Sequence, residues 1–226
     1  MTNPRDTDLI RRLAQDAGPV SRPPPPMVSA MIWFVLAVAS ALGVVLVMGL
    51  RPDFSERLGD PLYLVEVATP LMTSVLAAAA AFCASCPGRP VWERFAPIAP
   101  LALWLAALIR HAYLAYSASG QQALMLEIDA GCLPKIALIG MLPAVLIVLM
   151  LRRGAPIAPI TTTVLSALAA ASLAASALRL VHIQDASIMI LVWHVGSVAL
   201  IAASASIFGR RLFRWPTANL AIADPR

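Results

Sequence analysis

The sequence predicts an all-α protein, a six-helix transmembrane bundle preceded by a short cytoplasmic helix. Composition is the first observation, because 60% of the 226 residues are hydrophobic, only 13% are charged, and the mean hydropathy is +0.80. Soluble domains are about half apolar and about one-quarter charged. The second observation is that the apolar residues form runs of about 20, the length that crosses the roughly 30 Å hydrocarbon core of a membrane.

Six apolar runs follow a polar start, at residues 29–50, 62–85, 95–109, 133–151, 160–181 and 188–208. The third run is short, and the segment from His111 to Ala118 can extend it. This pattern divides the chain into an N-terminal segment with a proline-rich linker (1–28), a six-span domain (29–208) and a tail (209–226). We expect the first run to be an uncleaved anchor, because it is too long for a signal peptide.

Cations are distributed unequally between the loops, and this gives the third observation. Six spans place both termini on one side, together with 12 of the 17 cations, and leave five on the other side: Arg51, Arg57, Arg110, Lys135 and Arg179. Cytoplasmic loops carry an excess of Lys and Arg. Both termini are therefore predicted to be cytoplasmic. Since the cations lie at membrane boundaries and not in one patch, we expect no direct binding of nucleic acid.

The N-terminal segment carries a predicted helix from Asp8 to Ala17, with Asp6 or Thr7 as its cap. Its apolar side and the cations beside it consist of Leu9, Ile10, Leu13, Arg11 and Arg12. The sequence RPPPP at 22–26 predicts a polyproline II spacer before the first span. A helix of about ten residues is marginal in water. The segment is thus either a docking peptide that folds on a partner or a leader that is disordered or lies on the membrane.

Three cysteines and one intramembrane carboxylate are candidates for chemistry. Cys83 and Cys86 form C-x-x-C at the inner end of the second span, where they are packing residues or a redox or metal pair. Cys132 is alone on the outer side and is inert, a sensor, or half of an intermolecular disulfide. Glu66 lies a few residues inside the second span, so it can reach the headgroups or pair with Arg110 or Arg179.

The outer side also carries His111, His182, Asp129 and Asp185, which with Cys132 could offer ligands to a soft or borderline metal. Convergence of these groups does not follow from the sequence, and we expect no metal and no cofactor. Motifs for zinc proteases, serine hydrolases and P-loop ATPases do not occur. We therefore expect no enzymatic activity. A small transporter or channel is one function that six spans allow.

The boundary motifs resemble, as an ordered series, the NrsF family of bacterial membrane anti-sigma factors. The series runs from about Asp8 to Trp215 and consists of DLIRRLA (8–14), GLRPD (49–53), PGR (87–89), PLALWLA (100–106), GCL (131–133), LRRGAPIAP (151–159), LVWHVGSV (191–198) and GRRLFRW (209–215).

The resemblance implies a multi-pass protein of the bacterial inner membrane that holds an extracytoplasmic-function sigma factor inactive. It implies release of that partner on envelope, oxidative or heavy-metal stress. The docking residues would be Leu9, Ile10, Arg11, Arg12 and Leu13, and the sensing residues Cys132 and His182. Relatives often carry HCP where this chain has HIQ at 182–184, so an intramolecular disulfide switch between outer cysteines is not expected here.

Overall fold

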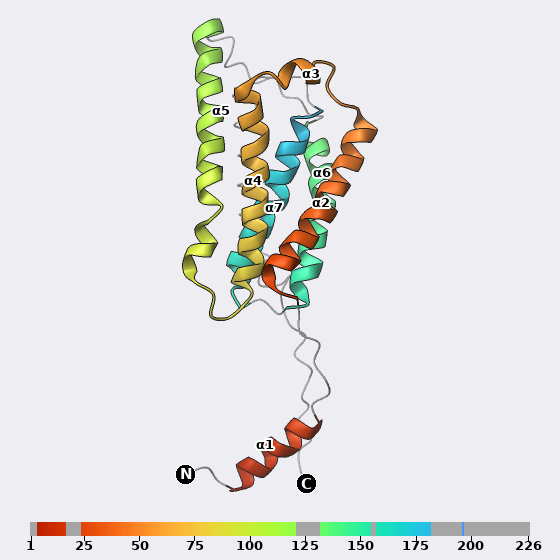
Figure 1. The fold of residues 1–226 in the computed structure, drawn as a ribbon, viewed down its shortest axis with the longest axis vertical. Helices are drawn as coiled ribbons and strands as arrows, with labels where there is room; N and C mark the ends of the chain where they lie inside the picture. Colours follow the sequence, from red (N-terminus) through yellow and green to blue (C-terminus); the bar gives the residue numbers. More distant parts are fainter. Residues whose placement is uncertain (1–3, 17–23, 121–131, 155–156, 182–195, 197–226) are drawn as a thin grey trace.

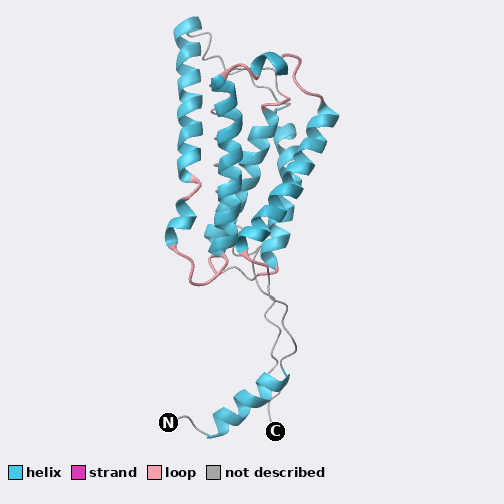
Figure 2. Cartoon of the chain, viewed as in Figure 1, coloured by secondary structure: helices cyan, strands magenta, loops and turns pink. Residues whose placement is uncertain are grey.

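A computed structural model of the chain describes residues 4–16, 24–120, 132–154, 157–181 and 196. These residues form helices and connecting loops and contain no strand (Figure 1, Figure 2). The helices are α1 (Pro4–Asp16), α2 (Pro26–Met48), α3 (Phe54–Arg57), α4 (Pro61–Ala84), the 3-10 helix η1 (Val91–Phe95), α5 (Ile98–Ser119), α6 (Cys132–Arg152) and α7 (Pro159–Leu178). The all-α prediction is confirmed for this part of the chain.

Five of the six predicted spans correspond to helices, namely α2, α4, α5, α6 and α7, and the predicted span at 188–208 lies outside the described residues. The third span is longer than its apolar run, because α5 continues through Arg110 and His111 to Ser119. Among the described residues, four helices are long and apolar enough to cross a membrane: α2, α4, η1 with α5, and α7. The part of α6 searched in the same way, Leu138–Arg152, is shorter.

Proline and glycine mark the helix boundaries. Helices α2, α4 and α7 each begin with proline, whose missing N–H is not needed in the first turn. At the start of α4, Asp60 is the N-cap, and its side chain accepts a hydrogen bond from the Leu62 N–H at 2.9 Å. Gly49 is the C-cap residue directly after α2, and its φ of +83° is a conformation that glycine adopts without steric cost.

Helix α7 is the centre of the bundle and packs most extensively against α4. Its sequence consists largely of Ala, Ser and Thr, and small residues allow close approach of neighbouring helices. Two hydrogen bonds join it to α4, from Ser74 Oγ to the Ala169 carbonyl at 2.7 Å and from Ser176 Oγ to the Val67 carbonyl at 2.8 Å. On the α6 side, a Cβ at Gly140 would lie 3.3 Å from the Cβ of Ala174.

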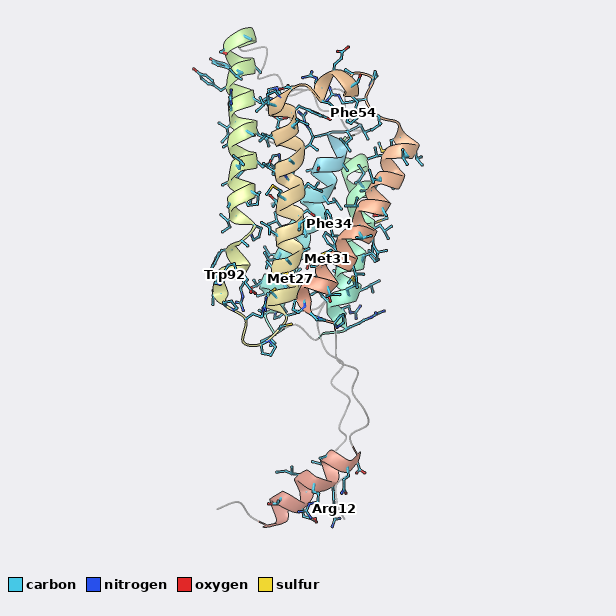
Figure 3. All side chains as sticks on the ribbon, in the orientation of Figure 1. Arg12, Met27, Met31, Phe34, Phe54 and Trp92 are labelled. Carbon is cyan, nitrogen blue, oxygen red and sulfur yellow. The ribbon has the colours of Figure 1, made fainter. Side chains whose placement is uncertain are left out.

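Helix α2 has one buried and one exposed apolar side. Trp33 is fully buried, and its indole N–H donates to the Pro143 carbonyl of α6 at 2.9 Å. On the other side, large apolar residues such as Met31 (Figure 3) and Val47 are exposed. An exposed apolar surface of this extent is unusual for a soluble monomer.

The two ends of the bundle carry different segments of the chain. We call the end that carries α3 and the C-terminal ends of α2, α5 and α7 the α3 end. We call the opposite end the linker end, because the segment from α1 enters α2 there. Figure 1 shows α1 outside the bundle, and every side chain described in this helix is exposed.

Candidate functional site

A carboxylate and an arginine are buried together at the α3 end. Glu66 in α4 is 1% exposed, and it accepts a hydrogen bond on Oε2 from the guanidinium of Arg179, which directly follows α7. The other carboxylate oxygen, Oε1, lies 2.7 Å from Nδ1 of His111 in α5. Glu66 thus connects three helices that are far apart in the sequence.

Tyr63 lies between two arginines, one turn before Glu66 on α4. The guanidinium carbons of Arg51 and Arg179 are 5.6 and 5.5 Å from the centroid of its ring. Both distances fall within the range of a cation–π interaction. The Tyr63 hydroxyl also donates to the Arg179 backbone carbonyl at 3.1 Å. We call Arg51, Tyr63, Glu66, His111 and Arg179 the buried polar cluster.

Arg51 ties the connection between α2 and α4 to this cluster. Its buried side chain donates two hydrogen bonds to the carboxylate of Asp53, at 2.6 and 2.8 Å, and its backbone N–H donates to the Leu180 carbonyl at 3.0 Å. Hydrogen bonds from Arg51, and one from Arg57, hold the pKa of Asp53 well below its usual range, although partial burial opposes this shift. The short helix α3 begins directly after Asp53.

Each arginine of the buried polar cluster has a carboxylate partner. Two arginines face the carboxylates of Asp53 and Glu66, and His111 adds a ring nitrogen on the second of these. Removing one partner of a buried pair typically costs about 3–5 kcal/mol, because the remaining charge has no counter-ion. The cluster therefore fixes the positions of α4, α5, α7 and the end of α2 relative to one another.

The pairing of Glu66 with Arg179, one of the two partners expected from the sequence, is confirmed. The sequence reasoning did not identify His111 as the second partner, nor Tyr63 and Arg51 as parts of the same cluster. A signal for Tyr63 was present, since it precedes Glu66 by three residues and lies on the same helix face. The contacts of Arg51 with Leu180 and Tyr63 depend on the packing of α2 beside α7, which no local pattern encodes.

At the linker end, the two cysteines of C-x-x-C have different environments. Cys83 is buried near the end of α4, and its Sγ accepts a hydrogen bond from Arg89 at 3.4 Å. Cys86 follows the end of α4 at Ala84, so the two cysteines do not lie on the same helix. It lines a cavity of about 300 Å³ that is formed by Pro24, Pro26, Ser29, Phe82, Ser85, Cys86, Met150, Leu151, Arg153 and Gly154.

The predicted docking residues lie on α1, which begins at Pro4 and ends at Asp16, so it starts four residues earlier than predicted. Its apolar residues Leu9, Ile10 and Leu13 are 57%, 66% and 62% exposed. Arg11 is exposed, and Arg12 forms an exposed salt bridge with Asp8 one turn earlier, at 2.9 Å (Figure 3). A contact of this kind contributes little stability. Helix α1 thus presents an exposed apolar surface, and none of its described side chains is buried.

The predicted sensing residues are only partly within the described structure. Cys132 is the first residue of α6, at the α3 end, but its side chain lies outside the described residues, as do His182, Asp129 and Asp185. In the described part of the chain, no group of three or more His, Cys, Asp or Glu side chains is placed to hold a metal ion. The roles of Cys132 and His182 therefore stay predictions.

Comparison with known proteins gives one family. The model of the NrsF family, described as negative regulator of sigma F, matches residues 13–215, which is most of the chain. The match begins within α1, so Leu9 to Arg12 precede it. No curated protein and no solved structure matches the chain.

Proposed function

Since the chain belongs to the NrsF family of negative regulators of sigma F, we propose that it is a membrane-bound anti-sigma factor. In this proposal it binds an extracytoplasmic-function sigma factor at the cytoplasmic face of a bacterial inner membrane and so keeps that factor from transcription. The proposed partner is a protein, and no direct contact with nucleic acid is required.

The observation that carries this proposal is helix α1. Leu9, Ile10 and Leu13 are all more than half exposed on a helix of 13 residues that lies outside the bundle (Figure 1). A helix this short gains little stability in water unless its apolar face is covered. Amphipathic helices of this size bind in apolar grooves of partner proteins, with anchors spaced three and four residues apart.

Membrane insertion is supported by the surface of the bundle. Helix α2 exposes large apolar residues along its length, and four helices have the length and composition to cross a bilayer. The excess of cations on the side of the termini favours a cytoplasmic linker end and an extracytoplasmic α3 end. In this orientation α1 lies in the same compartment as a sigma factor, and lipid tails cover the exposed face of α2.

The test uses the full-length protein in lipid nanodiscs, incubated with a soluble lysate of the source bacterium. We expect wild-type protein to retain a sigma factor, identified by mass spectrometry. Leu13→Asp places a charge in the apolar face of α1 and should reduce retention at least tenfold. Gln15→Asp adds the same charge on another side of the helix and is the matched control.

Two results would contradict the proposal. If folded wild-type protein retains no sigma factor, then the proposal of anti-sigma activity is wrong, and a transporter or channel becomes the leading alternative. If Leu13→Asp and Gln15→Asp both retain the sigma factor as wild type does, then the docking surface lies elsewhere, for example on the loops of the linker end.

For the release signal, we propose that Cys132 and His182 respond to oxidants or to soft metal ions at the extracytoplasmic face. Thiolate and imidazole are the side chains that soft and borderline metals prefer. Cadmium or a membrane-impermeant oxidant should dissociate the complex of the wild-type protein. The complex of Cys132→Ser should persist, whereas that of Cys86→Ser should dissociate normally. Equal dissociation of all three complexes would remove Cys132 from the mechanism.

A further inference from the structure

The described helices run between the α3 end and the linker end of the bundle. We propose that the buried polar cluster, centred on the Glu66–Arg179 pair, is the switch that couples the α3 end to the docking helix. In this proposal the cluster is closed while the sigma factor is bound, and separation of Arg179 from Glu66 accompanies release. The inference rests on the proposed function for its biological meaning, but the coupling itself can be measured without a sigma factor.

The first step of the argument is the position of Arg179. It directly follows α7, and its side chain is 6% exposed, in contact with Glu66 on α4. Its backbone carbonyl accepts from Tyr63, and the next carbonyl, of Leu180, accepts from Arg51. A displacement of Arg179 and Leu180 therefore acts on the side chains of Glu66 and Tyr63 and on the backbone N–H of Arg51.

The second step is the nature of the pair. An ion pair surrounded by apolar helices has two acceptable arrangements, one with the charges together and one with both charges in water. Intermediate separations leave uncompensated charge in an apolar environment and are disfavoured. The cluster lies near the start of α4, and His111, which contacts Glu66, is 21% exposed. In this proposal the Glu66–Arg179 pair therefore converts between the paired and the separated arrangement in one step.

The third step is the connection to the linker end. Arg51 follows α2 by three residues, and α2 begins at Pro26, immediately after the linker from α1. At that end Pro24 and Pro26 share one cavity with Cys86 of the α4 end and with Arg153 of the α6 end. Because helices are stiff, a shift of α2 against α4 at the cluster also changes this cavity and the point where α1 is attached.

The test measures the linker end while changing only the cluster. Glu66→Gln keeps the size of the side chain but leaves the Arg179 charge without a counter-ion, so it should open the cluster. The double variant Glu66→Gln with Arg179→Met removes both charges and should close it again. Thr73→Val is the matched control, since Thr73 is equally buried in α4 and donates only to the Thr69 carbonyl of its own helix.

The first readout is the rate at which a thiol reagent modifies Cys86, located by mass spectrometry in the protein in nanodiscs. We expect Glu66→Gln to raise this rate about fivefold or more, and the double variant and Thr73→Val to stay near wild type. The second readout is affinity for the purified sigma factor retained in the experiment above. We expect a loss of about tenfold for Glu66→Gln and recovery in the double variant, within the range typical of allosteric coupling.

The pattern of the two variants decides the result, because a purely local packing role makes the double variant at least as damaging as the single one. Unchanged Cys86 reactivity in folded Glu66→Gln overturns the inference, as does a double variant that is no better. If Glu66→Gln does not fold, His111→Leu removes one partner of Glu66 more mildly and must raise Cys86 reactivity. A wild-type protein that binds no sigma factor would refute the proposed function and leave the Cys86 test intact.

Discussion

Glu66 shows how a single residue can be compatible with an apolar helix bundle. A buried carboxylate is costly unless it is paired and hydrogen-bonded. Both oxygens of Glu66 have a partner, one from α7 and one from α5. The same principle explains Arg51, whose buried guanidinium is neutralised by the partly exposed Asp53. Each buried charged side chain described at the α3 end thus has an oppositely charged partner.

At the residue scale, Asp53 gives a prediction for the effect of pH on stability. Its pKa is lowered in the folded protein, so its contribution to stability is fully present above the ordinary aspartate pKa of about 3.9 and is lost as pH falls through the lower folded-state value. Asp53→Asn should lower the thermal unfolding midpoint in detergent at pH 7, and the difference from wild type should shrink below about pH 4. Glu56→Gln, at an exposed position in α3, should change neither. A difference that grows as pH falls would contradict this assignment.

At the element scale, α1 and α7 are opposite cases. Helix α7 is nearly surrounded by other helices, and its Ala, Ser and Thr residues suit this position because they allow backbones to approach. Helix α1 has large apolar residues on one side and packs on no other described element. The first is therefore a structural element of the bundle, and the second is available for a partner.

The contact between α6 and α7 gives the prediction at this scale. A Cβ at Gly140 would already lie 3.3 Å from Ala174 Cβ and 3.8 Å from the Ala170 carbonyl. Gly140→Leu should therefore force these helices apart and destabilise the protein by about 1–3 kcal/mol, measured by thermal or denaturant unfolding in detergent. Gly43→Leu is the control, because a Cβ at Gly43 in α2 meets nothing within 4 Å. Equal stability of both variants would show that α6 and α7 are not in close contact.

At the scale of the whole molecule, the two ends of the bundle have separate chemistry. The α3 end carries the buried polar cluster, and the linker end carries the cysteine-lined cavity and the attachment of α1. This division suits the proposed function, because the proposed signal and the proposed partner lie in different compartments. The proposed linkage between the ends is a change in helix packing, and its size is measured as a coupling free energy between the two sites.

The orientation of the bundle is directly testable. In a variant whose native cysteines are replaced, we expect Ser55→Cys in α3 to react with a membrane-impermeant maleimide in cells with a permeable outer membrane. Val91→Cys, exposed at the start of η1, should react only after the inner membrane is disrupted. The physical reason is the excess of cations on the side of the termini. The opposite labelling pattern would invert the topology and place α1 outside the cytoplasm.

Much of this protein follows from its sequence alone. The all-α class, the five helices α2, α4, α5, α6 and α7, the amphipathic α1 and the family all follow from apolar runs, proline positions and an ordered set of boundary motifs. These features are local, since helix length and hydrophobic pattern are set by neighbouring residues. The apolar run alone gives too short a third span, because Arg110 interrupts the run but not the helix, which continues to Ser119.

Only the tertiary structure decided which polar residues act together. Glu66 is 45 residues from His111 and 113 residues from Arg179 in the sequence, so no spacing rule connects the three side chains. The sequence left Glu66 with two possible arginines, and the packing of α7 against α4 selected Arg179. Likewise, the spacing of C-x-x-C did not show that α4 ends at Ala84, between the two cysteines. Contacts between distant segments depend on how helices pack, and that information is distributed over the whole chain.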